Sequence, residues 1–316
     1  MTAISASTPG KAILFGEHAV VYGYPAIAIP VSNVRTKTYI SANPRGKSDQ
    51  IFIEAPDIDL KNSIDDLPEN NPVKALLLLL KKHLNIHHFP SFNLKIKSTI
   101  PIAAGLGSGA AVSISIIRAL CGFLGIEINN EDISEIAFQI EKLHHGTPSG
   151  IDNTVITYKK PIYFVKDKPF KIVNIKNPFT LLIADSGVRS LTSEVVGGLR
   201  EKYRKMPQNI DQEFNKTGEI VDKAYTCLTH GDYEDLGILM NQNQEILSTL
   251  GVSHKVLDHL IDVAVSHGAF GAKLSGAGQG GNIIALVENN KAPSIAEKLI
   301  TAGAVKTIIT EVKSWS

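Results

Sequence analysis

The spacing of hydrophobic and polar positions predicts a half-buried strand and a buried helix in the first third of the chain. Residues 92–97 alternate apolar and polar side chains with period two, as a strand with one buried face does. Residues 73–84 contain a continuous apolar run, and Asn71 followed by Pro72 suits the start of a helix. The run is far shorter than the ~20 residues that a membrane span needs. The pattern therefore predicts a helix inside a protein core.

Two further helices follow from apolar positions that recur at helical spacing. Ser108–Leu124 is an apolar segment of helical length. Residues 131–145 place apolar side chains on one face, and Asn129 or Asn130 precedes them as an N-cap. Gly146 is expected to end this helix, because glycine favours the conformation that closes a helix.

Beyond about residue 170 the pattern changes to long polar helical stretches between short apolar strands. The predicted elements are a strand at 179–184, helices within 192–247, a helix at 253–266, and then strand 282–287, helix 294–301 and strand 305–312. Helices and strands that alternate in this way, with local pairing, indicate an α+β domain. Charges at 166–168 and Pro169 interrupt the apolar pattern. We therefore expect an N-terminal domain over residues 1–168 and a C-terminal domain over 169–316.

Composition and charge narrow the class of protein. A length of 316 residues fits two domains of ~150 residues each. The 32 basic and 31 acidic residues give a net charge of +1, which argues against a surface built for nucleic acid or an anionic membrane. Cys121 and Cys227 are too few for a disulfide framework or a four-cysteine zinc site. The first residues lack the features of a secretory signal, so we expect a cytoplasmic protein that handles charge at a local site.

The glycine-rich segment 101–111 (PIAAGLGSGAA) has the composition of an anion site. Gly105, Gly107 and Gly109 leave backbone N–H groups unshielded, and a helix follows at once, so several amides and a positive helix end converge. The Ser108 hydroxyl adds a group able to reach a metal ion or a phosphate oxygen. A tight turn that merely requires glycine is the structural alternative.

The segment does not match the two commonest phosphate loops. A Walker A loop ends in Gly-Lys-Ser/Thr, whereas this one ends in Gly109-Ala110-Ala111. The looser dinucleotide-binding pattern fits Gly105, Gly107 and Ala110, but no strand of convincing length surrounds the acidic residue about 20 positions later. That pattern also leaves two other glycine-bearing segments unexplained.

Those two segments are residues 9–18 (PGKAILFGEH) and 273–281 (KLSGAGQGG). Lys11 precedes an apolar run, so we expect it to be partly buried and to need an acidic partner or a phosphate. Residues 276–281 include four glycines, which are costly in chain entropy unless the backbone takes positive φ or approaches another group closely. A loose surface loop is the alternative for this segment.

Two carboxylates lie in informative positions. Glu141 falls at the border of the apolar face of the helix 131–145 and is not forced outward. Asp152 follows a proline and two glycines at 146–150, which fix an unusual turn that could aim its carboxylate into a cleft. Solvated carboxylates are the alternative. His144 and His145 are adjacent, so they do not face the same way on a helix and do not indicate a metal pair.

Taken together, residues 9–18, 101–111 and 273–281 resemble the three signature motifs of the GHMP kinases (galactokinase, homoserine kinase, mevalonate kinase and phosphomevalonate kinase), in the family's order and across essentially the whole chain. Within the family, residues 11–23 (KAILFGEHAVVYG) and 145–153 (HGTPSGIDN) are most similar to those of mevalonate kinases. The resemblance implies an α+β, two-domain GHMP kinase fold. Its N-terminal domain is like the second domain of ribosomal protein S5, its C-terminal domain is ferredoxin-like, and the active site lies in the cleft between them.

The resemblance also implies ATP-dependent phosphorylation of the 5-hydroxyl of mevalonate. By position, Asp152 matches the catalytic aspartate and Lys11 the lysine that neighbours it. Ser108 and Glu141 match the Mg²⁺ ligands. The triphosphate cradle matches Pro101, Ala104, Gly105, Leu106, Gly107, Ser108, Gly109 and Ala110. The mevalonate side matches Glu17, His18, Ser149, Thr192, Gly276 and Ala277.

Some alternatives stay open at the level of sequence. The acceptor could be phosphomevalonate or another position on mevalonate, and a kinase fold that only binds a nucleotide, or a nicotinamide dehydrogenase, would be a different class. A homodimer is a family-level expectation. Gln279 stands where the family usually has glycine, and its side chain should crowd the third segment or hydrogen-bond near it.

Overall fold

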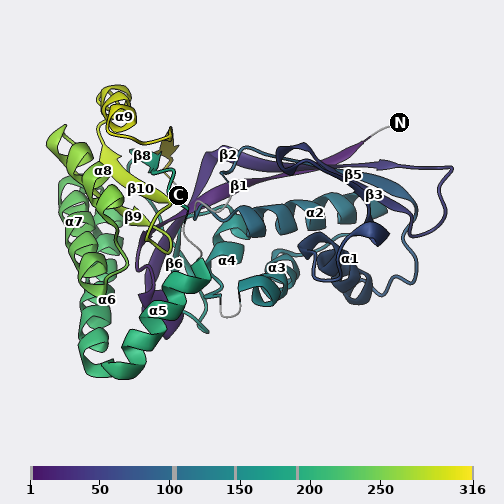
Figure 1. Ribbon diagram of the computed structural model, residues 1–316, viewed down its shortest axis with the longest axis horizontal. Coiled ribbons are helices and arrows are strands. Elements are labelled where there is room, and N and C mark those ends of the chain that lie inside the picture. Colours follow the sequence, from purple (N-terminus) through teal and green to yellow (C-terminus); the bar gives the residue numbers. More distant parts are fainter. Residues whose placement is uncertain (1–2, 102–104, 146–147, 190–191, 315–316) are drawn as a thin grey trace. The chain divides into compact units, whose positions relative to one another are not determined.

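The computed structural model describes residues 3–101, 105–145, 148–189 and 192–314. The chain forms two compact units, each assembled from separate stretches of sequence. The first unit contains residues 1–10, 34–101 and 107–159, and the second contains residues 11–33, 102–106 and 160–316. The units are discontinuous because two long strands, β1 (Ile4–Phe15) and β2 (Ala26–Ala42), contribute to both (Figure 1). The domain division after Lys168 stays a prediction.

The first unit contains a sheet to which the C-terminal part of β2 contributes. This part of β2 pairs antiparallel with β5 (Phe92–Ser98), β5 pairs parallel with β3 (Ile51–Ala55), and β3 pairs antiparallel with β4 (Leu60–Ser63). The predicted alternation in β5 is confirmed, because Phe92, Leu94 and Ile96 are buried and the intervening side chains are not.

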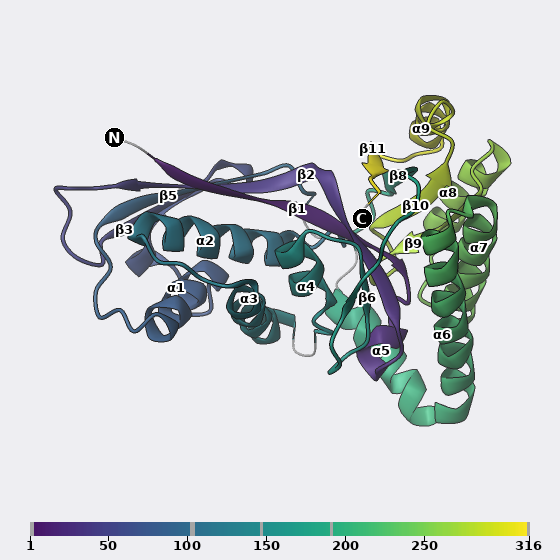
Figure 2. The same ribbon diagram turned by 180° about the vertical axis from the view of Figure 1, so that it is seen from behind.

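Helices cover one face of this sheet (Figure 2). They are α1 (Pro72–His83), α2 (Ser108–Leu124), α3 (Asn130–His145) and α4 (Ile151–Tyr158). The first three are confirmed predictions, and α1 begins as expected, with the Asn71 side chain accepting from the Val73 amide at 2.9 Å. Helix α4 was not predicted, because the sequence suggested only a turn there. Short 3-10 turns lie at Ala19–Tyr22, Pro56–Ile58 and Ile64–Asp66.

Polar contacts fix α4 against its neighbours. The Arg118 guanidinium on α2 donates to Asn130 Oδ1 at 2.7 Å and to the Thr157 carbonyl at 3.0 Å. The Asn153 amide donates to the Ser134 hydroxyl on α3 at 2.8 Å. These contacts therefore hold α2, α3 and α4 together within the first unit.

The second unit contains an antiparallel sheet in the order β11-β8-β10-β9. Its strands are β8 (Phe179–Asp185), β9 (Gly271–Ser275), β10 (Asn282–Val287) and β11 (Lys306–Val312). The short strands β6 (Ile162–Phe164) and β7 (Lys171–Ile172) extend the other sheet, where β6 pairs with Ala26–Ala28 of β2.

The described part of this unit also contains the α-helices α5 (Thr192–Lys205), α6 (Pro207–His230), α7 (Tyr233–Leu250), α8 (Lys255–Ser266) and α9 (Ala292–Thr301). Helices α7 and α8 pack on β9, and α9 packs on β8 and β11. The strands and helices predicted here are confirmed, with ends that differ by a few residues. Among the helices in the described ranges, none has the length and apolar character required to cross a bilayer.

Cys121 is buried in α2, and burial raises the pKa of its thiol to about 11. Both cysteines are free thiols. A thiol with so high a pKa is almost entirely protonated near neutral pH and is therefore unreactive.

Helix α7 lies unusually close to the start of β9. A Cβ atom added to Gly237 would lie 2.5 Å from the backbone carbonyl carbon and oxygen of Phe270. By contrast, a Cβ added to Gly197 on α5 would meet nothing within 4 Å. The two helical glycines therefore serve different purposes, although either would be read from sequence as a weak helix position.

We expect Gly237→Ala to lower the free energy of unfolding by about 1–3 kcal/mol, because the methyl group forces α7 away from the strand. Gly197→Ala is the matched control and should raise it by up to about 1 kcal/mol, since alanine is the better helix former. Urea unfolding followed by circular dichroism measures both. Equal stabilisation by the two substitutions would contradict the close packing of α7 on β9.

Candidate active site

The first glycine-bearing segment occupies the end of β1 and the turn after it. Lys11, expected to be partly buried, is 3% exposed. Its amide donates to the Leu106 carbonyl at 3.0 Å, which ties the second segment to β1. The turn places His18 in the left-handed region, with φ of 62°, a conformation uncommon for a residue other than glycine.

The second segment leads directly into α2, as predicted. Gly107 precedes the helix with φ of 72°, and no side chain caps the helix N-terminus there. Ser108 is the first residue of this 17-residue helix and is half-buried. Backbone N–H groups in the first turn of a helix lack intrahelical partners and carry the positive end of the helix dipole. This end of α2 is therefore suited to bind an anion. Ala104 lies outside the described residues.

The third segment joins β9 to β10 as a packed turn. Gly278 has φ of 83°, and a Cβ on it would collide with the Val252 carbonyl. The Gln279 amide donates to that same carbonyl at 2.8 Å, and the Gly281 amide donates to the Val188 carbonyl at 2.8 Å. The prediction that these glycines are needed for positive φ and close approach is confirmed, and the loose-loop alternative is wrong.

Gln279 contributes its side chain to this packing. Its amide nitrogen donates to the Gly251 carbonyl at 2.9 Å and the Ser253 carbonyl at 2.8 Å. The expected hydrogen bonding of this side chain near the loop is confirmed. Gln279 therefore fastens the turn to the connection between α7 and α8, which a glycine at this position could not do.

The parts of the three segments that belong to the second unit contact one another there. The Ser275 hydroxyl donates to the Ile13 carbonyl at 3.0 Å. His18 Nε2 donates to the Ala277 carbonyl at 2.8 Å. A Cβ on Gly105 would lie 3.2 Å from the Ser275 carbonyl oxygen, so the second segment approaches the third at its backbone. Residues far apart in the sequence thus form one cluster.

A buried ion pair links the first and third segments at the centre of this cluster. The Lys273 ammonium donates to Glu17 Oε1 and, at 2.7 Å, to the Leu274 carbonyl. Both side chains of the pair are 0% exposed. Burial raises the pKa of the Glu17 carboxyl and lowers that of the Lys273 ammonium, and the charge of each partner opposes the shift of the other.

No role was predicted for Lys273 from the sequence, although a signal was present. It is the one charged residue in the short strand β9, whose five residues are all buried. A lysine in such a strand requires an acidic partner, because an unpaired buried charge is strongly unfavourable. The sequence did not reveal that this partner is Glu17, since 256 positions separate the two residues.

The first unit carries three further candidate residues, Ser108, Glu141 and Asp152, on packed helices. Glu141 lies in the last turn of α3 and Asp152 in the first turn of α4, and both are half-buried. The turn expected around Asp152 ends at Gly150, with φ of 91°, so Asp152 lies on a helix. Helices α2, α3 and α4 pack against one another, which brings the elements bearing Ser108, Glu141 and Asp152 together.

The other predicted positions differ in exposure. Pro101, Gly107 and Ser149 are half-buried, as are Gly276 and Ala277, whereas Ala110 is buried and Gly109 and Thr192 are exposed. Within the ranges that the structure describes, no three His, Cys, Asp or Glu side chains converge as a multidentate metal site would require. Any divalent cation would therefore need further oxygen ligands from a substrate or water.

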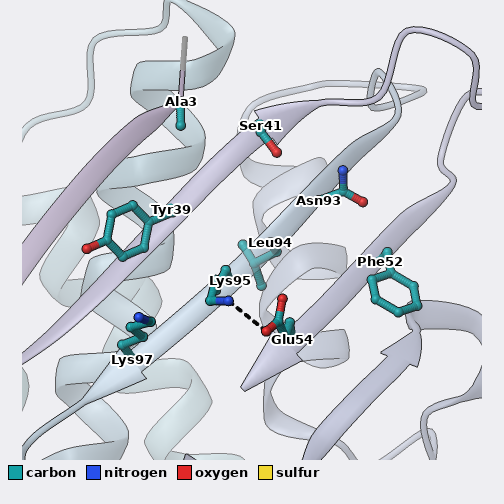
Figure 3. A pocket seen from close by; sticks show the side chains of 9 residues that line it. All are labelled: Ala3, Tyr39, Ser41, Phe52, Glu54, Asn93, Leu94, Lys95 and Lys97. Atoms are coloured by element: carbon teal, nitrogen blue, oxygen red, sulfur yellow. Dashed lines mark hydrogen bonds and ion pairs between the residues drawn. The ribbon is translucent and has the colours of Figure 1, made fainter. Parts of the chain in front are cut away.

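A groove on the sheet of the first unit contains none of the predicted site residues (Figure 3). It has a volume of about 640 Å³ and is lined by residues that include Tyr39, Phe52, Glu54 and Lys95. Glu54 and Lys95 form an ion pair at 2.7 Å across it. The groove supplies neither glycine-rich backbone nor a helix N-terminus.

His18 is held in a defined protonation state. Burial lowers its pKa to about 4, so the imidazole is neutral near pH 7. Because the Ala277 carbonyl can only accept, the single ring proton resides on Nε2. Nδ1 is then left as an acceptor, ready for a donor such as a hydroxyl group.

The buried neutral His18 makes stability depend on pH. Its pKa is about 4 in the folded protein and about 6.5 when unfolded, so the unfolded chain binds more protons between these values. The neutral His18 therefore contributes its full stabilisation above pH 6.5. This stabilisation, about 3 kcal/mol in total, is lost as the pH falls from 6.5 to 4.

His18→Gln retains a neutral N–H donor and does not titrate. We therefore expect its free energy of unfolding, measured in urea, to fall less than that of the wild type between pH 7.5 and pH 4. Parallel pH profiles for the two proteins would contradict the buried neutral state.

Comparisons with known proteins identify relatives of this chain. Residues 70–160 match the GHMP kinases N terminal domain, and residues 224–305 match the GHMP kinases C terminal domain. A mevalonate kinase of Thermococcus gammatolerans is 35% identical over 325 residues, covering 98% of this chain and 96% of the relative.

Two solved structures resemble the whole chain. The mevalonate kinase of L. major in complex with R-mevalonate superposes with a TM-score of 0.85 at 27% identity, covering 99% of this chain and 96% of that one. The Methanococcus jannaschii mevalonate kinase gives a TM-score of 0.83 at 30% identity, covering 100% and 99%.

The fold and the cluster therefore define a phosphotransferase of two α+β domains, as predicted. The chain belongs to the GHMP kinase family, whose members use ATP. The nicotinamide dehydrogenase alternative is thereby excluded.

Proposed function

We propose that this protein transfers the γ-phosphoryl group of ATP to the 5-hydroxyl of mevalonate, giving 5-phosphomevalonate and ADP. The observation that carries the proposal is the clustering of the three glycine-bearing segments, joined by the Lys11–Leu106, Ser275–Ile13 and His18–Ala277 hydrogen bonds. Relatives that match nearly the full chain are mevalonate kinases, and one such structure contains R-mevalonate. A cytoplasmic location and a homodimer both stay predictions.

The proposal assigns phosphate binding to the start of α2 and the turn before it. Phosphoryl transfer depends mainly on neutralising charge and placing the attacking oxygen in line. In the proposal, the backbone amides of Gly105 to Ala110, together with Pro101 and Ala104, form the triphosphate cradle. Lys11 contributes the positive charge that steadies the transferring group.

Asp152 is proposed as the catalytic base. An alcohol is a weak nucleophile, so a carboxylate oxygen that takes the hydroxyl proton as the phosphorus–oxygen bond forms promotes the attack. The position of Asp152 in the first turn of α4 supports this role, because the positive end of a helix favours a negative charge there.

Ser108 and Glu141 fit a Mg²⁺ ion in the chemistry of their donor atoms. One hydroxyl and one carboxylate are hard oxygen ligands, and Mg²⁺ in kinases completes its shell with waters and substrate phosphates. The two residues lie on packed helices of the first unit, which supports a shared role. When bound, the ion would neutralise charge on the phosphates.

The acceptor side is assigned to Glu17, His18, Ser149, Thr192, Gly276 and Ala277. The unprotonated Nδ1 of His18 is suited to accept a hydrogen bond from a hydroxyl of the acceptor. A neutral imidazole also leaves the acceptor carboxylate to be bound by other groups.

The proposal predicts that the wild type, with mevalonate, ATP and Mg²⁺, releases ADP, and that Asp152→Asn lowers the rate by about 10²–10⁴-fold. ATP should still bind the variant, because the substitution leaves the cradle intact. A coupled ADP assay measures turnover, and calorimetry measures ATP binding.

Asp262→Asn, an exposed position on α8, is the matched control and should turn over as the wild type does. Full turnover in Asp152→Asn would contradict the assigned role. A panel of mevalonate, phosphomevalonate, homoserine and galactose, with product regiochemistry by NMR, identifies the acceptor. No rise in ADP release with any of them would favour a nucleotide-binding module.

A further inference from the structure

The buried pair of Glu17 and Lys273 has no chemical step in the proposed reaction, yet it occupies the centre of the cluster. Both side chains are fully withdrawn from water. Two buried charges are tolerated only when each is closely paired and hydrogen-bonded, and removing one leaves the other uncompensated. The pair therefore fixes the distance between the two backbone segments that carry it.

Those segments hold His18, Gly276 and Ala277, three of the residues assigned to the acceptor. Glu17 directly precedes His18, whose backbone is in the left-handed region. Lys273 lies two residues before Ser275 and four before Ala277, on the strand that leads into the third segment. The hydrogen bonds Ser275–Ile13 and His18–Ala277 flank the pair. A shift of the pair would consequently move His18 and Ala277 together.

The environment of the pair is also tightly packed. A Cβ added to Gly16 would lie 2.5 Å from the Pro25 carbonyl, so the turn has little freedom to readjust. The Lys273 ammonium is further fixed by the Leu274 carbonyl. The Lys273 ammonium cannot move without breaking both its contact with Glu17 and its hydrogen bond to the Leu274 carbonyl.

We propose that the Glu17–Lys273 pair is a positioning device for the acceptor: it sets His18 and Ala277 in register, and Glu17 acts through Lys273 without touching the acceptor. The identity of the acceptor rests on the proposed function, whereas the mechanical role of the pair does not. Glu17 Oε2 accepts no hydrogen bond from any residue that the structure describes. Direct contact between that oxygen and the acceptor is the competing role.

A double-mutant cycle distinguishes the positioning role of the pair from direct contact between Glu17 and the acceptor. Glu17→Gln and Lys273→Met should each lower kcat/KM for mevalonate by about 10²-fold, since small misplacement of reacting groups has effects of that size. KM for ATP should change by less than about threefold, because the cradle is not part of the pair. If the residues act as one unit, the double variant is no worse than the poorer single variant. Effects that multiply in the double variant would overturn the proposal.

The matched control is the exposed pair Glu288–Lys291 on the surface of the second unit, with both partners more than 40% exposed. Glu288→Gln and Lys291→Met, alone or together, should leave the kinetics unchanged. Changes equal to those at Glu17 and Lys273 would show that the assay reports general destabilisation, and would overturn the positioning role.

If the neutral variants fail to fold, Lys273→Arg provides a second test of the proposal. It retains the charge, but its planar head group cannot occupy the position of an ammonium without displacing Glu17. We expect a melting temperature near that of the wild type and a loss of about tenfold in kcat/KM for mevalonate. Wild-type kinetics in this variant would overturn the proposal.

Amide hydrogen exchange tests the pair without any substrate. Exchange at residues 275–281 should accelerate in Lys273→Arg, whereas exchange in the helices of the first unit should not. Unchanged protection of this segment would overturn the proposal even if the enzyme phosphorylates mevalonate. Conversely, a wild type inactive on mevalonate but with this exchange response would refute the proposed function and leave the positioning role intact.

Discussion

The buried ion pair between Glu17 and Lys273 is the constraint on which the arrangement of the site depends. It joins residues 256 positions apart and has no access to water. Because both charges must stay paired, the end of β1 and the start of the third segment have one permitted spacing. The close approach of Gly105 to the Ser275 carbonyl then places the second segment beside them. Backbone amides, a lysine and a neutral histidine thus gather without a highly charged surface, consistent with a net charge of +1.

Elements whose signals are local could be predicted from the sequence. The period-two pattern of β5 and the Asn71 cap of α1 each depend on a few adjacent residues. The helix carrying Asp152 was not predicted, because it has only eight residues and follows a turn rich in glycine. The assignment of residues 11–33 to the second unit was also beyond the sequence, since periodicity does not indicate where a long strand passes from one core to another.

In the site, too, features that depend on adjacent residues could be predicted, whereas contacts between distant residues could not. The second segment could be located because its glycines directly precede a helix, and the packing of the third follows from its glycine content. The partner of Lys273 could not be found, because ion pairing between distant residues leaves no mark in spacing. The tautomer of His18 likewise depends on the Ala277 carbonyl, which only the fold brings to it. The sequence therefore predicted the chemical character of the segments but not the long-range contacts that position them.

The central claim is the proposed one, in which the second segment binds the phosphates of ATP and the third segment serves the acceptor side of the same reaction. Amide chemical shifts of the ¹⁵N-labelled protein, recorded on addition of Mg²⁺, a non-hydrolysable ATP analogue and mevalonate, test it most directly. The account predicts that the shifts gather at residues 105–110 and 275–281 together. Shifts that omit the third segment, or that gather at the groove around Tyr39 and Phe52, would contradict it.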